Sequence, residues 1–159
     1  MKVLACLTAL GLAMSWPAHA DRLPLPADAP ASFKAECGGC HLLFAPALLT
    51  APDWKRVMST LDHHYGDNAT LDEPVRREIE AFLLRHAATR DRLAAPADPP
   101  RLTATAWFRG EHRQVPQALW QEPQVKSAAN CGACHTRAGA GSFRESEILL
   151  PKPSNKQRN

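Results

Sequence analysis

Four cysteines and two histidines fall in the same five-residue pattern at two places in the chain. Residues 37–41 read CGGCH and residues 131–135 read CGACH. Two thiols at this spacing can add to the two vinyl groups of one haem, and the histidine that follows can bind the iron. The small residues between the thiols let the backbone lie close to a porphyrin. The sequence therefore predicts two covalently bound haem c groups.

Each residue of the pattern has a predicted role. The thioether bonds are assigned to Cys37, Cys40, Cys131 and Cys134, and the proximal iron ligands are assigned to His41 and His135. A structural zinc site built from both cysteine pairs would leave the histidines unexplained, and the interval of about 90 residues exceeds zinc-ribbon spacing. A pair of thioredoxin-like redox motifs would need a βαβ context, which the pattern of the chain does not provide.

A c-type haem usually takes its second axial ligand from methionine or histidine. Once an N-terminal leader is removed, Met58 is the one methionine left in the chain. One methionine cannot serve two haems, so at least one iron binds a second histidine or stays five-coordinate. The free histidines are His63, His64, His86 and His112.

Helix geometry separates the first two of these histidines. Pro52 and Asp53 predict the start of a helix that runs through about His64. Its apolar stripe consists of Trp54, Val57, Met58 and Leu61. At about 100° per residue, His64 lies on the flank of this stripe and His63 points away from it. The pattern therefore favours His64 as a ligand and His63 as a surface residue, and a methionine on such a stripe is more often packing.

The other two histidines differ in their surroundings. His86 falls near the end of a second predicted helix, which starts at Thr70 or Asp72 and runs to about Ala88. A helix C-terminus favours an imidazole through the helix dipole, so His86 has an explanation without iron. His112 follows two aromatic residues in a half that offers no other free histidine or methionine before Cys131. We therefore predict His64 and His112 as the distal ligands; sequence proximity pairs His41 with His64 and His135 with His112, although the ligands could cross over.

These residues together resemble a known family, the small periplasmic dihaem cytochromes c of purple-bacterial type with two bis-histidine haems. The resemblance runs from about Phe33 to Leu150, and its more specific parts are residues 61–69 (LDHHYGDNA) and residues 107–112, which begin WF and end EH. In the family the typical histidine directly precedes an aromatic–glycine step, which matches His64. The resemblance implies a low-potential electron carrier. Its implied partners are a monohaem c-type cytochrome with an exchangeable ligand and a membrane-bound cytochrome b or quinol pool.

The elements that must position these residues are short helices separated by proline-broken loops. We expect a short helix capped by Ser32 before the first motif, another over residues 125–131 before the second motif, and no substantial sheet. The apolar residues 42–49 are expected to cover a haem face. The proline-rich residues 89–106 read as a linker, so the fold class is mainly α with two haem-bearing halves. The predicted divisions are 21–90 and 91–150, followed by a disordered tail over 151–159.

Residues 1–20 predict where the protein works. They begin with Lys2, continue as a short apolar run and end in an A-x-A sequence, which is typical of a cleaved secretory signal peptide. We therefore expect a periplasmic location, and cleavage would also remove Cys6. No other stretch is apolar enough to span a membrane, so a membrane would be reached only through a partner protein.

The composition argues against nucleic-acid binding and indicates a small apolar core. The 159 residues carry 19 basic and 16 acidic side chains without a basic run, so no nucleic-acid partner is expected. Aromatic residues make up only 6% of the chain, so two haems would supply much of the core and the apoprotein should be largely unfolded.

Bis-histidine ligation leaves no open position on iron, which predicts an electron-transfer protein without a small-molecule substrate rather than an enzyme. The alternative is a peroxidase-like or gas-binding dihaem protein with one five-coordinate haem. A third possibility is a subunit or maturation factor docked to a membrane oxidoreductase.

Overall fold

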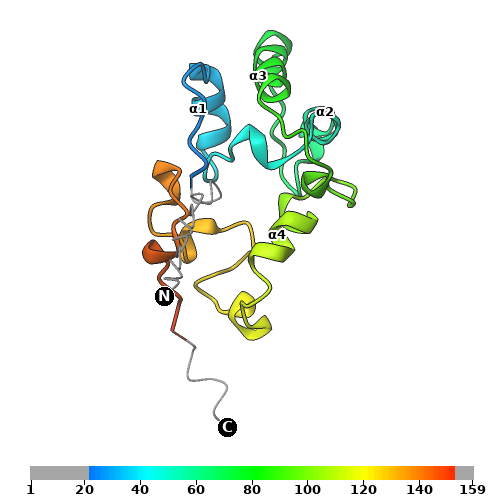
Figure 1. Cartoon of the computed structure of the whole chain (residues 1–159). Helices are drawn as coiled ribbons and strands as arrows, with labels where there is room; N and C mark the ends of the chain where they lie inside the picture. Colours follow the sequence, from blue (N-terminus) through cyan, green and yellow to red (C-terminus); the bar gives the residue numbers. More distant parts are fainter. Residues whose placement is uncertain (1–21, 153–159) are drawn as a thin grey trace, which may run out of the picture.

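The computed structural model describes residues 22–152 as a chain of short helices (Figure 1). The α-helices are α1 (Ala31–Gly38), α2 (Ala51–Met58), α3 (Glu73–Arg85) and α4 (Ala106–Glu111). Short 3₁₀ segments lie between these helices and continue the chain after α4: η2 (Pro46–Leu48), η3 (Leu61–His63), η4 (Asp91–Leu93), η5 (Leu102–Ala104), η6 (Gln117–Gln121), η7 (Cys131–Ala133), η8 (Ala138–Ala140) and η9 (Glu145–Glu147). Pairing of β type in this part of the chain is limited to isolated bridges. The predicted mainly α fold class is confirmed.

Proline and threonine define where the helices begin. Pro52 and Pro74 lie in the first turns of α2 and α3, where the missing N–H has no intrahelical partner to lose. The side chain of Thr105 caps α4 by accepting the N–H of Phe108 at 3.1 Å. The expected cap at Ser32 is wrong: α1 already begins after Pro30, and the Ser32 hydroxyl instead donates to Glu78 Oε2 of α3 at 2.6 Å.

The helix expected through His64 ends early, at Met58. The hydroxyls of Ser59 and Thr60 donate to the Arg56 carbonyl at 2.9 and 3.0 Å, and such local bonds compete with continuation of a helix. A single 3₁₀ turn follows, and Tyr65 then takes a left-handed φ of 53°. His63 and His64 therefore lie beyond the end of α2, and their side chains do not follow the helical angles predicted for them.

The short helix expected over residues 125–131 is also wrong. Turns and bends occupy this segment up to η7. Lys126 has a φ of 61°, which breaks a right-handed helix, and the Asn130 side-chain amide donates to the Val125 carbonyl at 3.0 Å. A polar, locally bonded loop therefore leads into the second motif.

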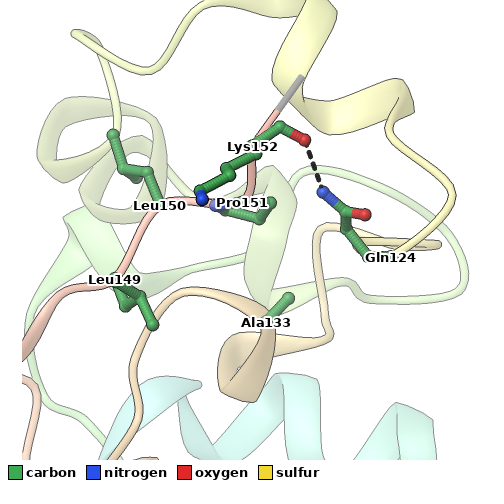
Figure 2. A pocket seen from close by; sticks show the side chains of 6 residues that line it. All are labelled: Gln124, Ala133, Leu149, Leu150, Pro151 and Lys152. Carbon is green, nitrogen blue, oxygen red and sulfur yellow. Dashed lines mark hydrogen bonds between the residues drawn. The ribbon is translucent and has the colours of Figure 1, made fainter. Parts of the chain in front are cut away.

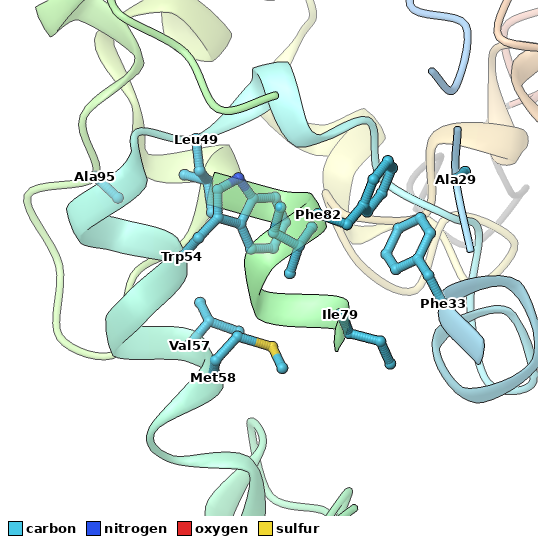
Figure 3. Close-up of a cluster of buried hydrophobic side chains, with 10 residues drawn as sticks. Ala29, Phe33, Leu49, Trp54, Val57, Met58, Ile79, Phe82 and Ala95 are labelled. Carbon is cyan, nitrogen blue, oxygen red and sulfur yellow. The ribbon is translucent and has the colours of Figure 1, made fainter. Parts of the chain in front are cut away.

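The main apolar core lies where α1, α2 and α3 pack together (Figure 3). Phe33 of α1 meets Phe82 of α3 with ring centres 5.0 Å apart. Trp54 of α2 donates its indole N–H to the Pro46 carbonyl at 2.7 Å, which satisfies its polar atom in a buried position. Beyond residue 100 the buried apolar side chains are few: Phe108, Val125 and Ala138.

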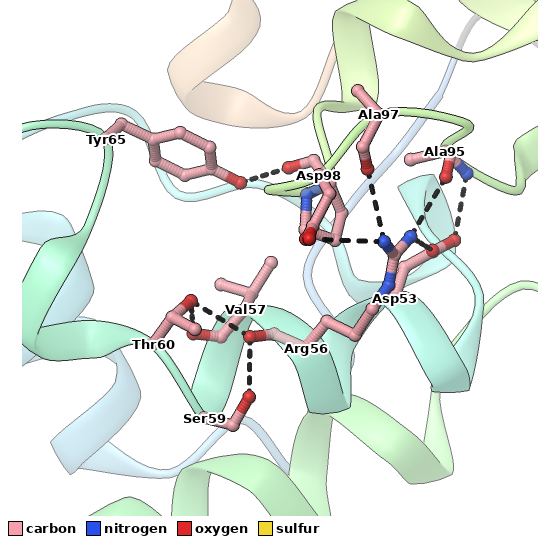
Figure 4. A network of polar contacts seen from close by, with 10 residues as sticks. Asp53, Arg56, Val57, Ser59, Thr60, Tyr65, Ala95, Ala97 and Asp98 are labelled. Carbon is pink, nitrogen blue, oxygen red and sulfur yellow. Dashed lines mark hydrogen bonds and ion pairs between the residues drawn. The ribbon is translucent and has the colours of Figure 1, made fainter.

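A polar network joins α2 to the linker (Figure 4). The Arg56 guanidinium donates to the carbonyls of Ala95 and Ala97 at 3.0 and 3.2 Å and to Asp53 Oδ1 at 2.7 Å. The N–H of Ala95 donates to Asp53 Oδ2 at 3.0 Å, and the Thr50 hydroxyl donates to the same oxygen. The linker is therefore held against α2 rather than free.

The N-terminal lead-in lies against the second half of the chain. Leu23 N–H donates to the Gly141 carbonyl at 2.9 Å, and Arg22 forms a β-bridge with Ser142. Gly141 has a φ of 68°, and a Cβ there would come within 2.8 Å of Pro24 Cα. The division at residues 90 and 91 stays a prediction, with this segment crossing it.

Two further predictions concern the ends of the chain. The signal peptide lies outside the described residues, and so does most of the predicted tail. Within residues 22–152, no helix has the length and apolar character needed to cross a bilayer.

Candidate haem sites

The first motif lies where α1 ends. Cys37 is in the last turn of the helix, half-buried, and Cys40 follows beyond it with its side chain exposed. The second motif is a 3₁₀ turn, with Cys131 and Cys134 both half-buried. All four thiols are free of disulfides.

Burial raises the pKa of three of these thiols, at Cys37, Cys131 and Cys134; at Cys37 the charge of Glu36 adds to it and the pKa reaches about 11. Across the described chain, no three His, Cys, Asp or Glu side chains group together as a ready metal site, so the cysteine pairs do not converge on one zinc site.

The fold brings the four predicted iron ligands together as two pairs. The ring centres of His41 and His64 are 6.3 Å apart, and those of His112 and His135 are 6.1 Å apart. A metal–imidazole bond is about 2.0 Å long and the ring centre lies about 1.1 Å beyond the nitrogen, so two imidazoles on opposite sides of one metal have centres about 6.2 Å apart. Both pairs therefore fit one iron each.

Hydrogen bonds select the nitrogen that is free for iron in two of the rings. His41 Nδ1 lies 2.7 Å from the Leu42 carbonyl, and His112 Nδ1 lies 2.9 Å from the Phe108 carbonyl. Since a carbonyl only accepts, Nδ1 carries the proton and Nε2 keeps its lone pair. Such a bond also fixes the ring orientation and increases ligand basicity.

The other two rings are held in apolar surroundings. Burial, and then the neighbouring imidazole, lowers the pKa of His64 and of His135. Lower pKa values favour the neutral imidazole, which is the form that binds metal. His135 Nδ1 is buried and has no hydrogen-bond partner among residues 22–152. A buried imidazole of this kind fits a metal ligand better than a structural hydrogen-bonding group.

Each of the four imidazoles contacts a neighbouring aromatic ring, and His112 contacts a second one, Trp120, with ring centres 5.7 Å apart. The sequence indicates two of these rings, Tyr65 in the aromatic–glycine step after His64 and Phe108 four residues before His112. Phe44 and Phe143 follow no common spacing, so the sequence carries little signal for them. The pairs and their ring-centre distances are His41–Phe44 (4.9 Å), His64–Tyr65 (4.8 Å), His112–Phe108 (4.1 Å) and His135–Phe143 (5.2 Å).

The remaining candidate ligands have other environments. The His63 side chain is 85% exposed, with Nδ1 2.8 Å from Asp62. His86 lies at the end of α3, with Nε2 2.9 Å from Asp28. Met58 is buried in the core formed with α3. The fold thus provides an alternative role for each of them, while ligation by His64 and His112 stays a prediction supported by geometry.

Tyr65 links the first site to the chain that leads to the second. Its hydroxyl donates to the Pro100 carbonyl, and the Arg101 guanidinium lies 4.7 Å from its ring centre. Residues that directly follow Arg101 form η5 and then α4, whose C-cap is His112. The segment from Pro100 to His112 therefore begins in contact with Tyr65, the neighbour of His64, and ends at the predicted ligand of the second site.

An apolar surface borders the second motif (Figure 2). The Leu149 N–H donates to the Cys134 carbonyl at 2.8 Å, and Ile148 forms a β-bridge with His135. Leu149 is 68% exposed and Leu150 is 53% exposed, and both line a shallow pocket with Ala133. Large apolar side chains are thus exposed beside the second attachment site.

Comparison with known proteins gives consistent matches. A family model described as dihaem cytochrome c matches residues 33–143. A solved diheme cytochrome type c from Shewanella baltica OS155 is 36% identical with a TM-score of 0.66, covering 76% of this chain and 92% of that one.

Two further solved structures, described as DHC and as diheme cytochrome c, come from Rhodobacter sphaeroides. The first is 32% identical with a TM-score of 0.61, covering 75% of this chain and 99% of that one. The second is 33% identical with a TM-score of 0.64, covering 72% of this chain and 96% of that one. No curated protein matches the sequence.

Proposed function

The chain belongs to the dihaem cytochrome c family and carries two covalently bound haem c groups, and from this premise we propose that it is a low-potential electron-transfer protein of the periplasm with bis-histidine ligation at both irons. The observation that carries the proposal is the spacing of the two imidazole pairs, 6.3 Å and 6.1 Å between ring centres. Family membership by itself supports an electron-transfer role.

The ligand set determines what chemistry the chain permits. Haem c supplies one-electron chemistry when bound. Two histidines on one iron leave no position for oxygen or peroxide, so the residues of the chain limit the reaction to gain and loss of an electron. His41 and His112 donate Nδ1–H to carbonyls, which makes the imidazoles stronger donors and favours the ferric state. An imidazole ligand in place of a methionine thioether also favours the ferric state, so it lowers the reduction potential of the haem.

The proposed partners are proteins. We assign the donor to a membrane cytochrome b or quinol pool and the acceptor to a soluble monohaem c-type cytochrome. The predicted signal peptide over residues 1–20 supports the periplasmic location.

Carbon monoxide tests the proposal directly. The dithionite-reduced holoprotein at neutral pH is expected to show no Soret change when carbon monoxide is added, because both irons are saturated. The ferric protein is expected to be low-spin without the Met–iron charge-transfer band. A large Soret change would instead identify an open position and favour a gas-binding or peroxidase-like protein.

A further inference from the structure

The two imidazole pairs differ in the angle between their ring planes. His41 and His64 are nearly parallel, with an interplanar angle of 19°, whereas His112 and His135 are nearly perpendicular, at 84°. An imidazole that binds iron contains the N–Fe–N axis in its plane. If both imidazoles of a pair bind one iron, the interplanar angle would be the angle between the two ligand planes about that axis.

At the first site the neighbours hold the near-parallel arrangement. His41 is bonded through Nδ1 to the Leu42 carbonyl at 2.7 Å, and Phe44 lies against its ring at 26°. His64 meets the edge of Tyr65, whose hydroxyl is tied to Pro100. Rotation of either ring would break one of these contacts.

At the second site the neighbours hold the perpendicular arrangement. His112 bonds to the Phe108 carbonyl at 2.9 Å and stacks on the Phe108 ring at 23°. His135 has no such hydrogen bond at Nδ1, and its ring instead meets Phe143 at 60° with centres 5.2 Å apart. The plane of His135 therefore depends on packing, chiefly against Phe143.

The ligand planes control the electronic state of a low-spin ferric haem. The π orbital of an imidazole is perpendicular to its ring and raises the iron dπ orbital that it faces. Parallel rings raise the same dπ orbital and separate the pair, whereas perpendicular rings raise one each and leave the two nearly equal in energy. Axial ligands and their hydrogen-bonded neighbours are established means of tuning haem iron.

We propose that Phe44 and Phe143 are positioning residues that set the planes of the imidazole ligands. The imidazole planes would be parallel at His41/His64 and perpendicular at His112/His135, which would make the two haems electronically distinct. The proposal rests on the bis-histidine ligation of the proposed function. Phe44 and Phe143 bind no iron and both are half-buried; Phe44 also packs against the main core, and a leucine keeps an apolar side chain at either position.

Electron paramagnetic resonance of the oxidised holoprotein tests the proposal. We expect two low-spin ferric signals of equal spin count, one rhombic and one highly anisotropic. Phe143→Leu should shift or broaden the highly anisotropic signal and leave the rhombic one unchanged, and Phe44→Leu should do the reverse. Each variant is the matched control for the other.

Histidine variants assign the signals to the sites. His64→Ala should remove the rhombic signal and convert that haem to high spin, while the highly anisotropic signal remains. Loss of the other signal instead, two signals of the same class, or an unchanged signal in both phenylalanine variants would overturn the proposal while leaving bis-histidine ligation intact. A high-spin signal in the unmodified protein would overturn the proposed function itself.

Discussion

The predicted iron ligands are distinguished by their positions relative to one another. His63 and His64 are adjacent in the chain, but only His64 faces His41 across the distance that one iron requires. His86 is engaged with Asp28 at 2.9 Å, and His112 faces His135. Single substitutions at these four histidines should therefore separate ligands from neighbours.

His64→Ala and His112→Ala are each expected to convert one haem of the two to a high-spin form that binds carbon monoxide, because one axial position is opened. His63→Ala and His86→Ala are the matched controls and should leave both haems low-spin. Optical spectra of the ferric proteins measure the spin state, and spectra of the ferrous proteins with carbon monoxide measure whether an axial position is open. A fully low-spin His64→Ala or His112→Ala protein would show that the assignment at that site is wrong.

At the scale of elements, the linker is held to α2 by a buried carboxylate. Burial tends to raise the pKa of Asp53, but hydrogen bonds from Thr50, Arg56 and the Ala95 N–H outweigh it, so the pKa lies below its ordinary value of 3.8. A group with a lowered folded-state pKa stabilises the fold above its unfolded pKa. This stabilisation is lost as the pH falls through the folded-state value.

Asp53→Asn is expected to lower the free energy of unfolding of the holoprotein by about 2 kcal/mol at neutral pH, because Arg56 and the Ala95 N–H lose a charged acceptor. The difference from the unmodified protein should shrink as the pH falls below about 4. Urea unfolding across this pH range measures it. Asp91→Asn, at an exposed position of η4, is the control, and an equal loss in both variants would contradict a specific role for the network.

The lead-in meets the second half of the chain at Gly141, which combines a left-handed φ with a close backbone neighbour. Gly141→Ala is expected to destabilise the holoprotein by about 1–3 kcal/mol, because the new Cβ would press on Pro24 and the backbone conformation is costly for alanine. Gly139→Ala, where nothing lies within 4 Å of an added Cβ, should have little effect. Thermal unfolding of both proteins measures the difference; similar melting temperatures would show that the contact contributes nothing.

At the scale of the whole molecule, the two halves depend differently on their haems. The first half has a buried core of its own, with Ile79 and Phe82 fully enclosed. Beyond residue 100 the buried apolar side chains are only Phe108, Val125 and Ala138, since the buried Ala95 packs with the core of the first half. A half with so little apolar contact relies on its haem for most of its packing.

Removing one haem at a time should reveal this difference. The double variant Cys131→Ala/Cys134→Ala is expected to lose hydrogen-exchange protection over most of residues 107–150 and to keep it in α1, α2 and α3. The matched variant Cys37→Ala/Cys40→Ala should retain part of the protection in α2 and α3, because their contacts do not pass through the motif. If both variants lost hydrogen-exchange protection equally in both halves, the second half would not depend more on its haem than the first half does.

Much of this protein is determined by local sequence. The haem attachment pattern is complete within five residues, so its chemistry can be read without the fold. Helix starts near Pro52 and at Asp72 also depend on neighbours in the chain, and the structure confirms both, with Asp72 as the N-cap of α3. The end of α2 and the loop before Cys131 were predicted wrongly, because side-chain bonds to nearby carbonyls and a left-handed Lys126 overrode the apolar pattern.

The tertiary structure alone decided which side chains surround each predicted proximal histidine. The partner of each proximal histidine, the aromatic contacts of Phe44 and Phe143, and the 19° and 84° ring angles all depend on how separate segments are brought together. Thus the sequence by itself determined that two haems are bound and predicted the residues that attach them, since the attachment pattern is local. The proposed distal ligand of each iron is a long-range contact, and only the packing of the chain determines which imidazole lies opposite each predicted proximal histidine and at what angle.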